Sequence, residues 1–277
     1  MQTHAPVKKS EAKILEIHPE PTLDEIWDLC VRNFLYDQKK YVDEIVALFD
    51  KIGITKESRI ADVSAGGGFP AINLAKLGYR VDCFDGFADE LFNKNAKKEG
   101  VSAECKKILW QKIPHIVRLE SYDFIFCRGN SFIFAGGGWD KITPDIDMEK
   151  VTRDYTNTMK IFADILKDGG YMYIDKFKDS EQGHREKLAT IKVGDHEEGL
   201  IFSSDRNQGD GFRRVYMERV VGKKTVSKES RITYDLSETE LIEMAKSAGF
   251  SKINAINDFI GSEKHFDVWL TKKAKMI

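Results

Sequence analysis

A glycine-rich loop between an expected strand and an expected helix restricts the folds open to this chain. The loop, Ser64-Ala65-Gly66-Gly67-Gly68, follows a short apolar run at 59–63 and precedes a helical pattern at 71–77. Side chains in such a loop would keep the backbone away from a ligand, so glycines here allow N–H groups to approach a nucleotide closely. Asp85 follows at the end of the next expected strand, where a carboxylate can accept both hydrogen bonds of a ribose diol. The alternative is a tight turn followed by a helix-capping Asp.

The central part of the chain alternates strand and helix patterns. We expect strands at 59–63, 79–84, 103–109, 122–127 and 171–174, and helices at 71–77, 88–98 and 155–166, the last closed by Gly169-Gly170. Strands with little polar alternation, separated by helices, indicate a parallel sheet covered on both faces. A helix starting at Ser237 and two strands near 253–257 and 266–271 follow. The predicted fold is therefore α/β and Rossmann-like.

The length of the chain and its residue patterns predict one domain with two additional segments. The chain has 277 residues, which at about 150 residues per domain allows two domains or one domain with an insertion. Residues 1–20 are polar and proline-containing, and we expect a flexible N-terminal arm. We expect a helical lid at 21–53, capped by Thr22 and stopped by Gly53. Residues 181–235 alternate like an antiparallel insertion, so 21–277 form a single domain.

Composition excludes several classes of function. The chain carries 43 Lys and Arg against 45 Asp and Glu, a net charge of −2, whereas nucleic-acid binding favours a large basic excess. There is no apolar run near the about 18 residues that span a bilayer, and Met1 to Ser10 lacks a signal-peptide core. The four cysteines form no CxxC pair and the histidines no metal-ligand spacing. We expect a cytoplasmic protein with reduced cysteines, no metal, no membrane partner and no nucleic-acid partner.

The glycine loop alone fits two kinds of adenosine ligand. Gly66-x-Gly68-x-x-Ala71 also matches the dinucleotide fingerprint of dehydrogenases, which need a second mononucleotide-binding half. After Ile174 the chain instead turns to the antiparallel insertion and ends as a helix and two strands. This ending favours a methyltransferase sheet.

Three motifs resemble those of class I S-adenosylmethionine-dependent methyltransferases, and most of all the glycine and sarcosine N-methyltransferase group. They are Asp62-Val63-Ser64-Ala65-Gly66-Gly67-Gly68, Asp85-Gly86-Phe87-Ala88 and Phe126-Cys127-Arg128-Gly129-Asn130-Ser131-Phe132. The resemblance implies a seven-stranded sheet, mostly parallel with the final strand antiparallel, helices on both faces, S-adenosyl-L-methionine as cofactor and S-adenosyl-L-homocysteine as product.

The same resemblance implies which residues bind the cofactor. Residues 64–68 would line its methionine part, Asp85 its ribose, and Gly86 and Phe87 its adenine. Trp27 would cover it, since a sulfonium cation can rest on an aromatic face; the alternative is a Trp packed in an amphipathic helix. Arg128 is given a backbone role. The full set is Trp27, Asp62, Ser64, Gly66, Gly68, Asp85, Gly86, Phe87, Leu109, Trp110 and Arg128.

On the acceptor side, Asn130 matches the family's Asn at the tip of the fourth strand. The alternative is a turn Asn that caps the next helix. Tyr36 and Trp139 are the other acceptor-side candidates. Phe177 stands where glycine methyltransferases carry an Arg that grips the substrate carboxylate, so glycine itself is not indicated, and a larger or more apolar acceptor is.

These features favour methyl transfer to a small molecule, and first to the amine of an amino acid or an amino-acid-like metabolite. Transfer to oxygen or sulfur of a secondary metabolite is the second hypothesis. A cofactor-binding regulatory protein without catalytic activity is the third. The resemblance also implies that subunits can pair into a homo-oligomer.

Overall fold

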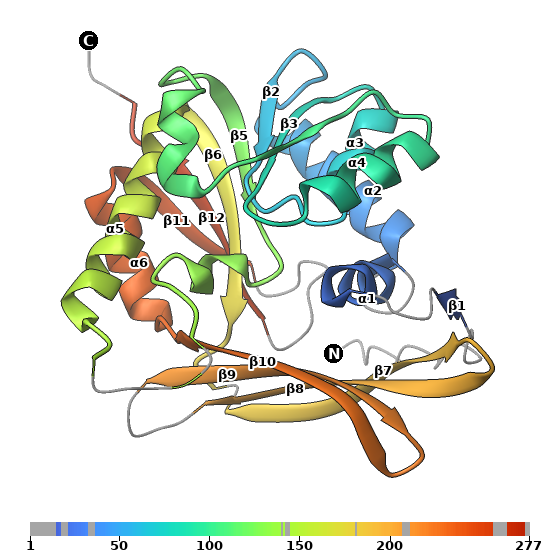
Figure 1. Cartoon of the computed structure of the whole chain (residues 1–277). Coiled ribbons are helices and arrows are strands. Elements are labelled where there is room, and N and C mark those ends of the chain that lie inside the picture. The colour runs from blue at the N-terminus through green and yellow to red at the C-terminus, as the bar shows by residue number, and fades with distance from the viewer. Residues whose placement is uncertain are drawn as a thin grey trace, which may run out of the picture.

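Two β-sheets and their surrounding helices make up the computed structural model (Figure 1). It describes residues 15–17, 22–32, 37–139, 141, 145–180, 182–206, 211–256 and 265–274. The main sheet has seven strands in the order β11-β12-β6-β5-β2-β3-β4. They are β2 (Arg59–Asp62), β3 (Arg80–Asp85), β4 (Cys105–Lys107), β5 (Tyr122–Cys127), β6 (Leu166–Phe177), β11 (Phe250–Ile256) and β12 (His265–Lys272).

The direction of the strands confirms the predicted fold class. Strands β2 to β6 pair in parallel, whereas β12, the last strand of the chain, runs antiparallel to both β6 and β11. The helices are α1 (Leu23–Cys30), α2 (Gln38–Ile52), α3 (Ala71–Lys76), α4 (Asp89–Lys98), α5 (Met148–Ile165) and α6 (Glu238–Ser247), with short 3-10 helices η2 (Trp110–His115) and η3 (Ser131–Phe134).

The strand order reverses between β2 and β5, in the middle of the main sheet. We call the carboxyl ends of the strands at this point the ligand-binding edge, since sheets of this kind bind ligands there. The chain runs outward from β2 through β3 to β4, then returns to build β5 on the other side of β2. Loops leaving β2 and β5 therefore diverge, and ligands of open α/β sheets bind at such a point, outside the carboxyl ends of the strands.

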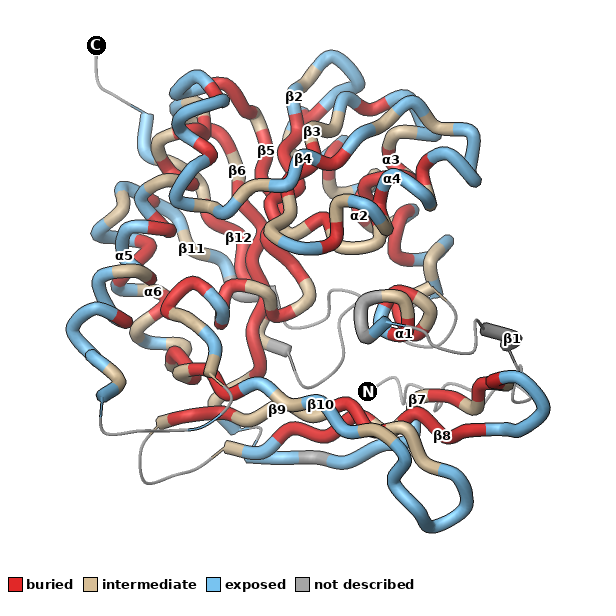
Figure 2. Tube along the Cα trace, in the orientation of Figure 1, coloured by how far each residue is buried: buried red, intermediate tan, exposed pale blue. Residues whose placement is uncertain are grey.

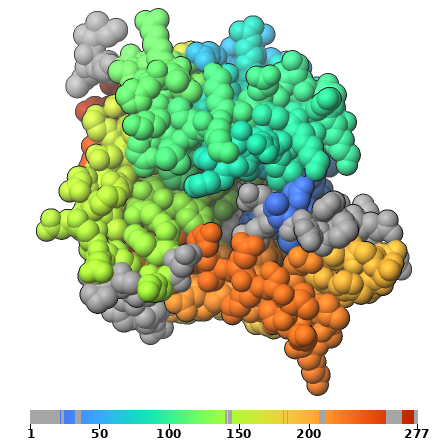
Figure 3. Space-filling model, in the orientation of Figure 1, coloured from blue at the N-terminus to red at the C-terminus, as the bar shows by residue number. Residues whose placement is uncertain are grey.

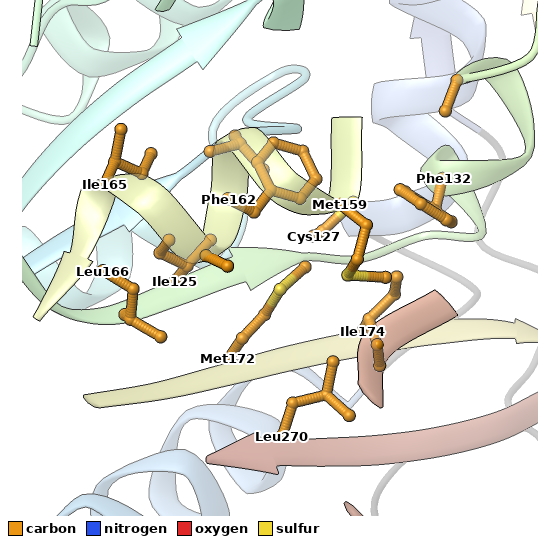
Figure 4. Packing of buried hydrophobic residues seen from close by; sticks show 14 of the residues in the cluster. Ile125, Cys127, Phe132, Met159, Phe162, Ile165, Leu166, Met172, Ile174 and Leu270 are labelled. Carbon is orange, nitrogen blue, oxygen red and sulfur yellow. The ribbon is translucent and has the colours of Figure 1, made fainter. Parts of the chain in front are cut away.

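Both faces of the main sheet are buried (Figure 2). On one face, β5 and β6 pack against α5 through side chains that include Ile125, Met172 and Phe162 (Figure 4). On the other face, Phe49 of α2 contacts the rings of Phe124 and Phe126. This double burial explains the nearly unbroken apolar runs of these strands.

The second sheet contains the predicted insertion. Its order is β1-β7-β8-β9-β10, with β7 (Gly183–Val193), β8 (His196–Arg206), β9 (Phe212–Val221) and β10 (Lys224–Tyr234) pairing antiparallel. The sheet lies beside the carboxyl ends of the main sheet's central strands, across from α1 (Figure 1). An apolar cluster joins Phe177 at the end of β6, Ile26 and Cys30 of α1, and Leu200 and Met217 of the second sheet.

The N-terminal segments differ from the prediction. Residues 15–17, expected in a flexible arm, form β1 (Leu15–Ile17), which pairs parallel with β7. The reason is that β7 would otherwise be an edge strand, whose unpaired backbone groups accept another strand. Of the helices at 21–53, α1 lies against the glycine loop and the second sheet, whereas α2 covers the main sheet.

Two helix boundaries confirm their sequence signals. The Ser237 hydroxyl accepts a hydrogen bond from the N–H of Glu240, whose carboxylate accepts one from the N–H of Ser237. Gly53 ends α2 with a φ of +77°.

The prediction for Gly169-Gly170 is wrong. Helix α5 begins earlier than predicted, at Met148, and ends at Ile165. The glycines lie inside β6, where the pairing with β5 shifts register. A Cβ on Gly170 would lie 2.9 Å from the Lys167 carbonyl oxygen, so only glycine fits this close backbone approach.

Among the described residues, no helix combines the length and apolar character needed to cross a membrane.

We expect Phe49→Ala to lower the free energy of unfolding by about 3–5 kcal/mol, because it removes a fully buried ring and leaves a cavity. Urea denaturation followed by circular dichroism measures the change. Phe87→Ala is the matched control, since that ring is 77% exposed, and we expect a change within about 0.5 kcal/mol. Equal losses in the two variants would contradict the position of α2 in the core.

Candidate active site

The glycine loop after β2 adopts a conformation that other residues would resist. Gly66 and Gly68 have φ angles of +49° and +106°, the left-handed region that favours glycine. A Cβ on Gly67 would lie 1.9 Å from Oδ1 of Asp28 in α1. The Arg32 guanidinium and the Asn95 amide both donate to the Gly67 carbonyl and to the Asp28 carboxylate. Helix α1 is thereby fixed directly on the loop.

Asp62, at the end of β2, carries a buried carboxylate with one unsatisfied oxygen. Oδ1 accepts the Ser64 N–H at 3.1 Å, whereas Oδ2 has no hydrogen-bond partner among the described residues. Burial raises the pKa of Asp62 to about 7, with the charge of Asp85 adding to the shift and Arg128 opposing it. A buried carboxylate oxygen without a partner indicates that a ligand could donate a hydrogen bond to it. A cationic donor would suit the carboxylate best.

Asp85, at the end of β3, ties the loop to the following turn. Its Oδ2 accepts the Gly66 N–H at 2.9 Å, and its Oδ1 accepts the N–H groups of Phe87 and Ala88 at 2.8 and 2.9 Å. The turn-capping role that the sequence left open is therefore present. Ribose binding by Asp85 stays a prediction, and each carboxylate oxygen has lone pairs for it.

Two exposed apolar side chains flank Asp85. Phe87 is 77% exposed and Leu109 53% exposed, and a Cβ on Gly86 would lie 3.2 Å from the Leu109 side chain. Exposed apolar groups near a small residue such as Gly86 could contact a flat aromatic ligand. Adenine binding by these residues stays a prediction.

The two tryptophans predicted for the cofactor pack against protein. The Trp110 indole N–H donates to the Val63 carbonyl at 2.5 Å, and its ring contacts Phe132 and Phe162. Trp27 packs on Phe202 of the second sheet, with ring centroids 5.7 Å apart, and is 37% exposed. Trp110 thus fixes the start of the glycine loop, and Trp27 links α1 to the second sheet.

Ser64 and Arg128 join the loops after β2 and β5. The Ser64 hydroxyl accepts the Arg128 N–H at 2.9 Å and donates to the Arg128 carbonyl at 3.2 Å. The Arg128 guanidinium points to the other side, over the rings of Tyr41 and Phe69. A contact of the Arg128 backbone with the cofactor stays a prediction.

The Asn130 turn is shaped by β6. Gly129 and Asn130 both have left-handed φ angles, +75° and +57°, and both N–H groups donate to the Asp175 carboxylate, at 3.0 and 2.7 Å. The Asn130 side chain makes no capping bond to η3; its Oδ1 accepts the Phe177 N–H at 3.3 Å. The helix-capping alternative for Asn130 is therefore wrong.

Sequence reasoning missed Asp175 as a site residue. The available signal was an acidic residue at the end of an apolar strand, but its partners come from β5. Asp267 of β12 lies directly opposite Asp175 and accepts the Tyr173 hydroxyl at 2.6 Å. Burial, together with the Asp175 charge, raises the pKa of Asp267 to about 7.

The remaining acceptor-side predictions fall in different places. Trp139 exchanges two backbone hydrogen bonds with Ile232 of β10 and packs on Phe212. Tyr36 lies outside the described residues. Phe177 is buried, and the Arg213 guanidinium lies 4.8 Å above its ring. Among the described residues, no group of three or more His, Cys, Asp or Glu side chains could hold a metal ion.

We expect the stability of the ligand-free protein to fall as pH rises from 5 to 7. Asp62 and Asp267 have pKa values near 7 when folded, against an ordinary value near 4, so the folded state binds more protons in this range. Deprotonation of each group then lowers the free energy of unfolding by about 2 kcal/mol between pH 5 and 7. In urea denaturation, the free energy of unfolding of Asp267→Asn should fall by about 2 kcal/mol less than that of the parent protein over this pH range. Equal slopes would contradict the raised pKa.

Comparison with solved structures identifies the fold. Streptomyces venezuelae DesVI matches with a TM-score of 0.66 at 14% identity, over 92% of this chain and 100% of its own. The sugar N-methyltransferase KedS8 from Streptoalloteichus matches with 0.65 at 12% identity, over 98% and 99%. An S-adenosylmethionine-dependent methyltransferase from Clostridium acetobutylicum matches with 0.64 at 14% identity, over 90% and 97%. Comparison of the sequence with family models and with curated proteins finds no match.

At these identities the similarity establishes the fold alone. It covers the main sheet and the second sheet, because each match spans at least nine-tenths of both chains. The resemblance to the glycine and sarcosine group stays a prediction. The chain has the fold of S-adenosylmethionine-dependent methyltransferases.

Proposed function

We propose that this protein is an S-adenosylmethionine-dependent methyltransferase that acts on the amine of a small molecule. The observation that carries the proposal is the unsatisfied, buried Oδ2 of Asp62 beside the glycine loop. Two carboxylates, Asp62 and Asp85, border this loop. Asp85 suits the ribose of either ligand, whereas the ionised carboxylate of Asp62 would repel the pyrophosphate of a dinucleotide and attract the ammonium and sulfonium charges of S-adenosylmethionine. The electrostatics therefore favour the methyl donor over NAD.

Residues at the ends of β2, β3 and β4 would each bind a different part of the cofactor. Asp62 would accept the ammonium group, the Gly66–Gly68 backbone would lie along the methionine part, and Asp85 would accept the ribose hydroxyls. Phe87 and Leu109 would hold the adenine between them. The bound cofactor supplies an activated methyl group for an in-line displacement.

The protein's main contribution to the reaction is alignment. Orientation of two reactants can supply about 7–11 kcal/mol of the barrier, and the acceptor side of the edge is unusually well fixed. Asp175 holds the backbone of Asn130 and the Phe177 N–H holds its side chain. Asn130 can thus orient a polar group of the acceptor without moving.

An amine acceptor is supported by the charge of the edge and by the neighbours. The edge carries the carboxylates Asp62, Asp85 and Asp175, which attract a protonated amine before it loses its proton. KedS8 is described as a sugar N-methyltransferase and CalS10 as an amino pentose methyltransferase. We extend the proposed acceptors from amino acids to amino sugars on that basis. Transfer to oxygen or sulfur is the second candidate.

A labelled-methyl screen tests the function. Purified protein would be incubated with labelled S-adenosylmethionine and amino acids, amino sugars, hydroxylated metabolites and thiols, while calorimetry compares S-adenosylhomocysteine with NAD. Methylation of amines and preference for the adenosylhomocysteine support the proposal. Preference for NAD overturns it. Binding of the cofactor without methylation across the panel would favour a regulatory protein.

We expect the affinity for S-adenosylhomocysteine to fall as pH drops below 7. The pKa of Asp62 is about 7, and only its ionised form attracts the ligand's ammonium group, so the association constant should fall toward tenfold per pH unit below pH 6. Calorimetry between pH 5.5 and 8.5 measures this. Asp62→Asn should remove the pH dependence and weaken binding at pH 8 by about 1.5–3 kcal/mol. A flat profile in the parent protein would contradict the role of Asp62.

We expect Asp175→Asn to lower kcat at least tenfold with little change in affinity for S-adenosylhomocysteine. An Asn side chain offers one acceptor oxygen where two N–H groups need one each, so the Asn130 turn shifts. Losing a charged hydrogen bond costs about 1.5–3 kcal/mol, and 1.4 kcal/mol is tenfold. Asp82→Asn is the surface control, since its side chain is 45% exposed. A parallel loss of cofactor affinity would show that Asp175 is structural.

A further inference from the structure

A buried polar cluster lies on the inner face of the second sheet. We call it the Arg213 cluster, and its members are Ser204, Arg206, Arg213, Thr233 and Asp235. Arg213 of β9 pairs directly with Arg206 of β8 and with Thr233 of β10. Phe202, Ser204 and Arg206 are two residues apart along β8, so their side chains lie on one face of the sheet. This face packs against α1 and the end of β6.

Only some of the polar atoms in the cluster have a hydrogen-bond partner among the described residues. The Arg213 guanidinium donates to Oδ2 of Asp235 at 3.0 Å and to the Ser204 hydroxyl at 2.9 Å. Arg206 lies 3.1 Å from the same Oδ2. Two guanidinium groups therefore converge on one oxygen of Asp235.

The other oxygen of Asp235 and the hydroxyl of Thr233 are unsatisfied. Among the described residues, neither Asp235 Oδ1 nor Thr233 Oγ1 has a hydrogen-bond partner. Thr233 is 0% exposed and Asp235 2% exposed. Leaving such groups buried is costly, so each calls for an explanation. They are two residues apart, on the same side of the chain at the end of β10.

Contacts connect this cluster to the acceptor side of the active site. The Arg213 guanidinium lies over the ring of Phe177, and the Phe177 N–H donates to the Asn130 side chain. On the face seen in Figure 3, a hollow separates the orange strands of the second sheet from the green residues beside it. The cluster is therefore two contacts away from the residue that would orient the acceptor.

We propose that Thr233 and Asp235 form a subsite for a hydroxyl group of the acceptor, at a distance from the methylated amine. This inference rests on the proposed function. Asp235 Oδ1 can only accept, and Thr233 Oγ1 can donate; one hydroxyl group satisfies both, donating to Asp235 and accepting from Thr233. The guanidinium groups of Arg206 and Arg213 lie beside this carboxylate, and their charges disfavour a second ammonium. The acceptor class is thus a hydroxylated amine.

A first test uses the free protein and needs no acceptor. In Thr233→Val, a buried unsatisfied hydroxyl is replaced by a methyl of similar size, so the melting temperature should stay the same or rise. Ser204→Ala is the contrast, because it removes one hydrogen-bond partner of Arg213, and the melting temperature should fall. A fall in Thr233→Val like that of Ser204→Ala would overturn the proposal. It would show that an ordered water or another internal partner already satisfies Thr233.

A second test uses the acceptors of the labelled-methyl screen, at saturating S-adenosylmethionine. Glucosamine and other amino sugars would be compared with cyclohexylamine, an amine of similar size without hydroxyls. Thr233→Val should raise KM for the amino sugar about tenfold, with kcat, KM for cyclohexylamine and affinity for S-adenosylhomocysteine unchanged. Ser203→Ala is the matched control, because Ser203 Oγ is also unsatisfied but lies on the opposite face of β8, and it should match the parent.

The outcomes separate this inference from the proposed function. Unhydroxylated amines methylated as well as amino sugars, or an equal rise in KM for both classes in Thr233→Val, would overturn the subsite while leaving the methyltransferase intact. Failure to bind S-adenosylhomocysteine would instead overturn the proposed function, and with it this inference.

Discussion

The parallel pairing of β2 with β5 is the constraint on which the rest of the structure depends. It brings two strand ends together while the chain leaves them in different directions, so a loop rich in glycine and a loop carrying Asn130 border the same edge. The Ser64 hydroxyl then joins the two loops through both backbone groups of Arg128. A single side chain of a small residue thereby fixes the spacing between the glycine loop and the Asn130 turn.

Carboxylates at this edge shape the backbone before they meet a ligand. Asp85 accepts three N–H groups and Asp175 accepts two, in each case from turns whose backbone groups have no strand partner. Asp62 is different, because burial leaves one oxygen unsatisfied and raises its pKa to about 7. Asp85 and Asp175 thus shape the turns of the candidate site, whereas one oxygen of Asp62 has no hydrogen-bond partner among the described residues.

The second sheet and α1 complete the site from outside the main sheet. Asp28, Arg32 and Asn95 attach α1 to the glycine loop, and Trp27 attaches it to Phe202. The same sheet brings Arg213 over Phe177. The position where the glycine methyltransferase pattern has an Arg is therefore filled by an aromatic ring covered by a guanidinium from another element. Acceptor recognition that depends on this corner is a property of two segments far apart in the chain.

The sequence by itself determined the fold class, the glycine loop and the ligand-binding edge. Apolar strands that alternate with helices allow few arrangements, and Asp62 and Asp85 stand at strand ends that a parallel sheet must bring together. Helix starts such as Ser237 were also predictable, because capping acts within four residues. Tertiary structure alone decided that Asp175 clamps Asn130, that Trp110 bonds Val63 and that Thr233 and Asp235 are left unsatisfied. Each depends on groups from different strands, since burial and hydrogen bonding at long range follow from packing and have no local pattern.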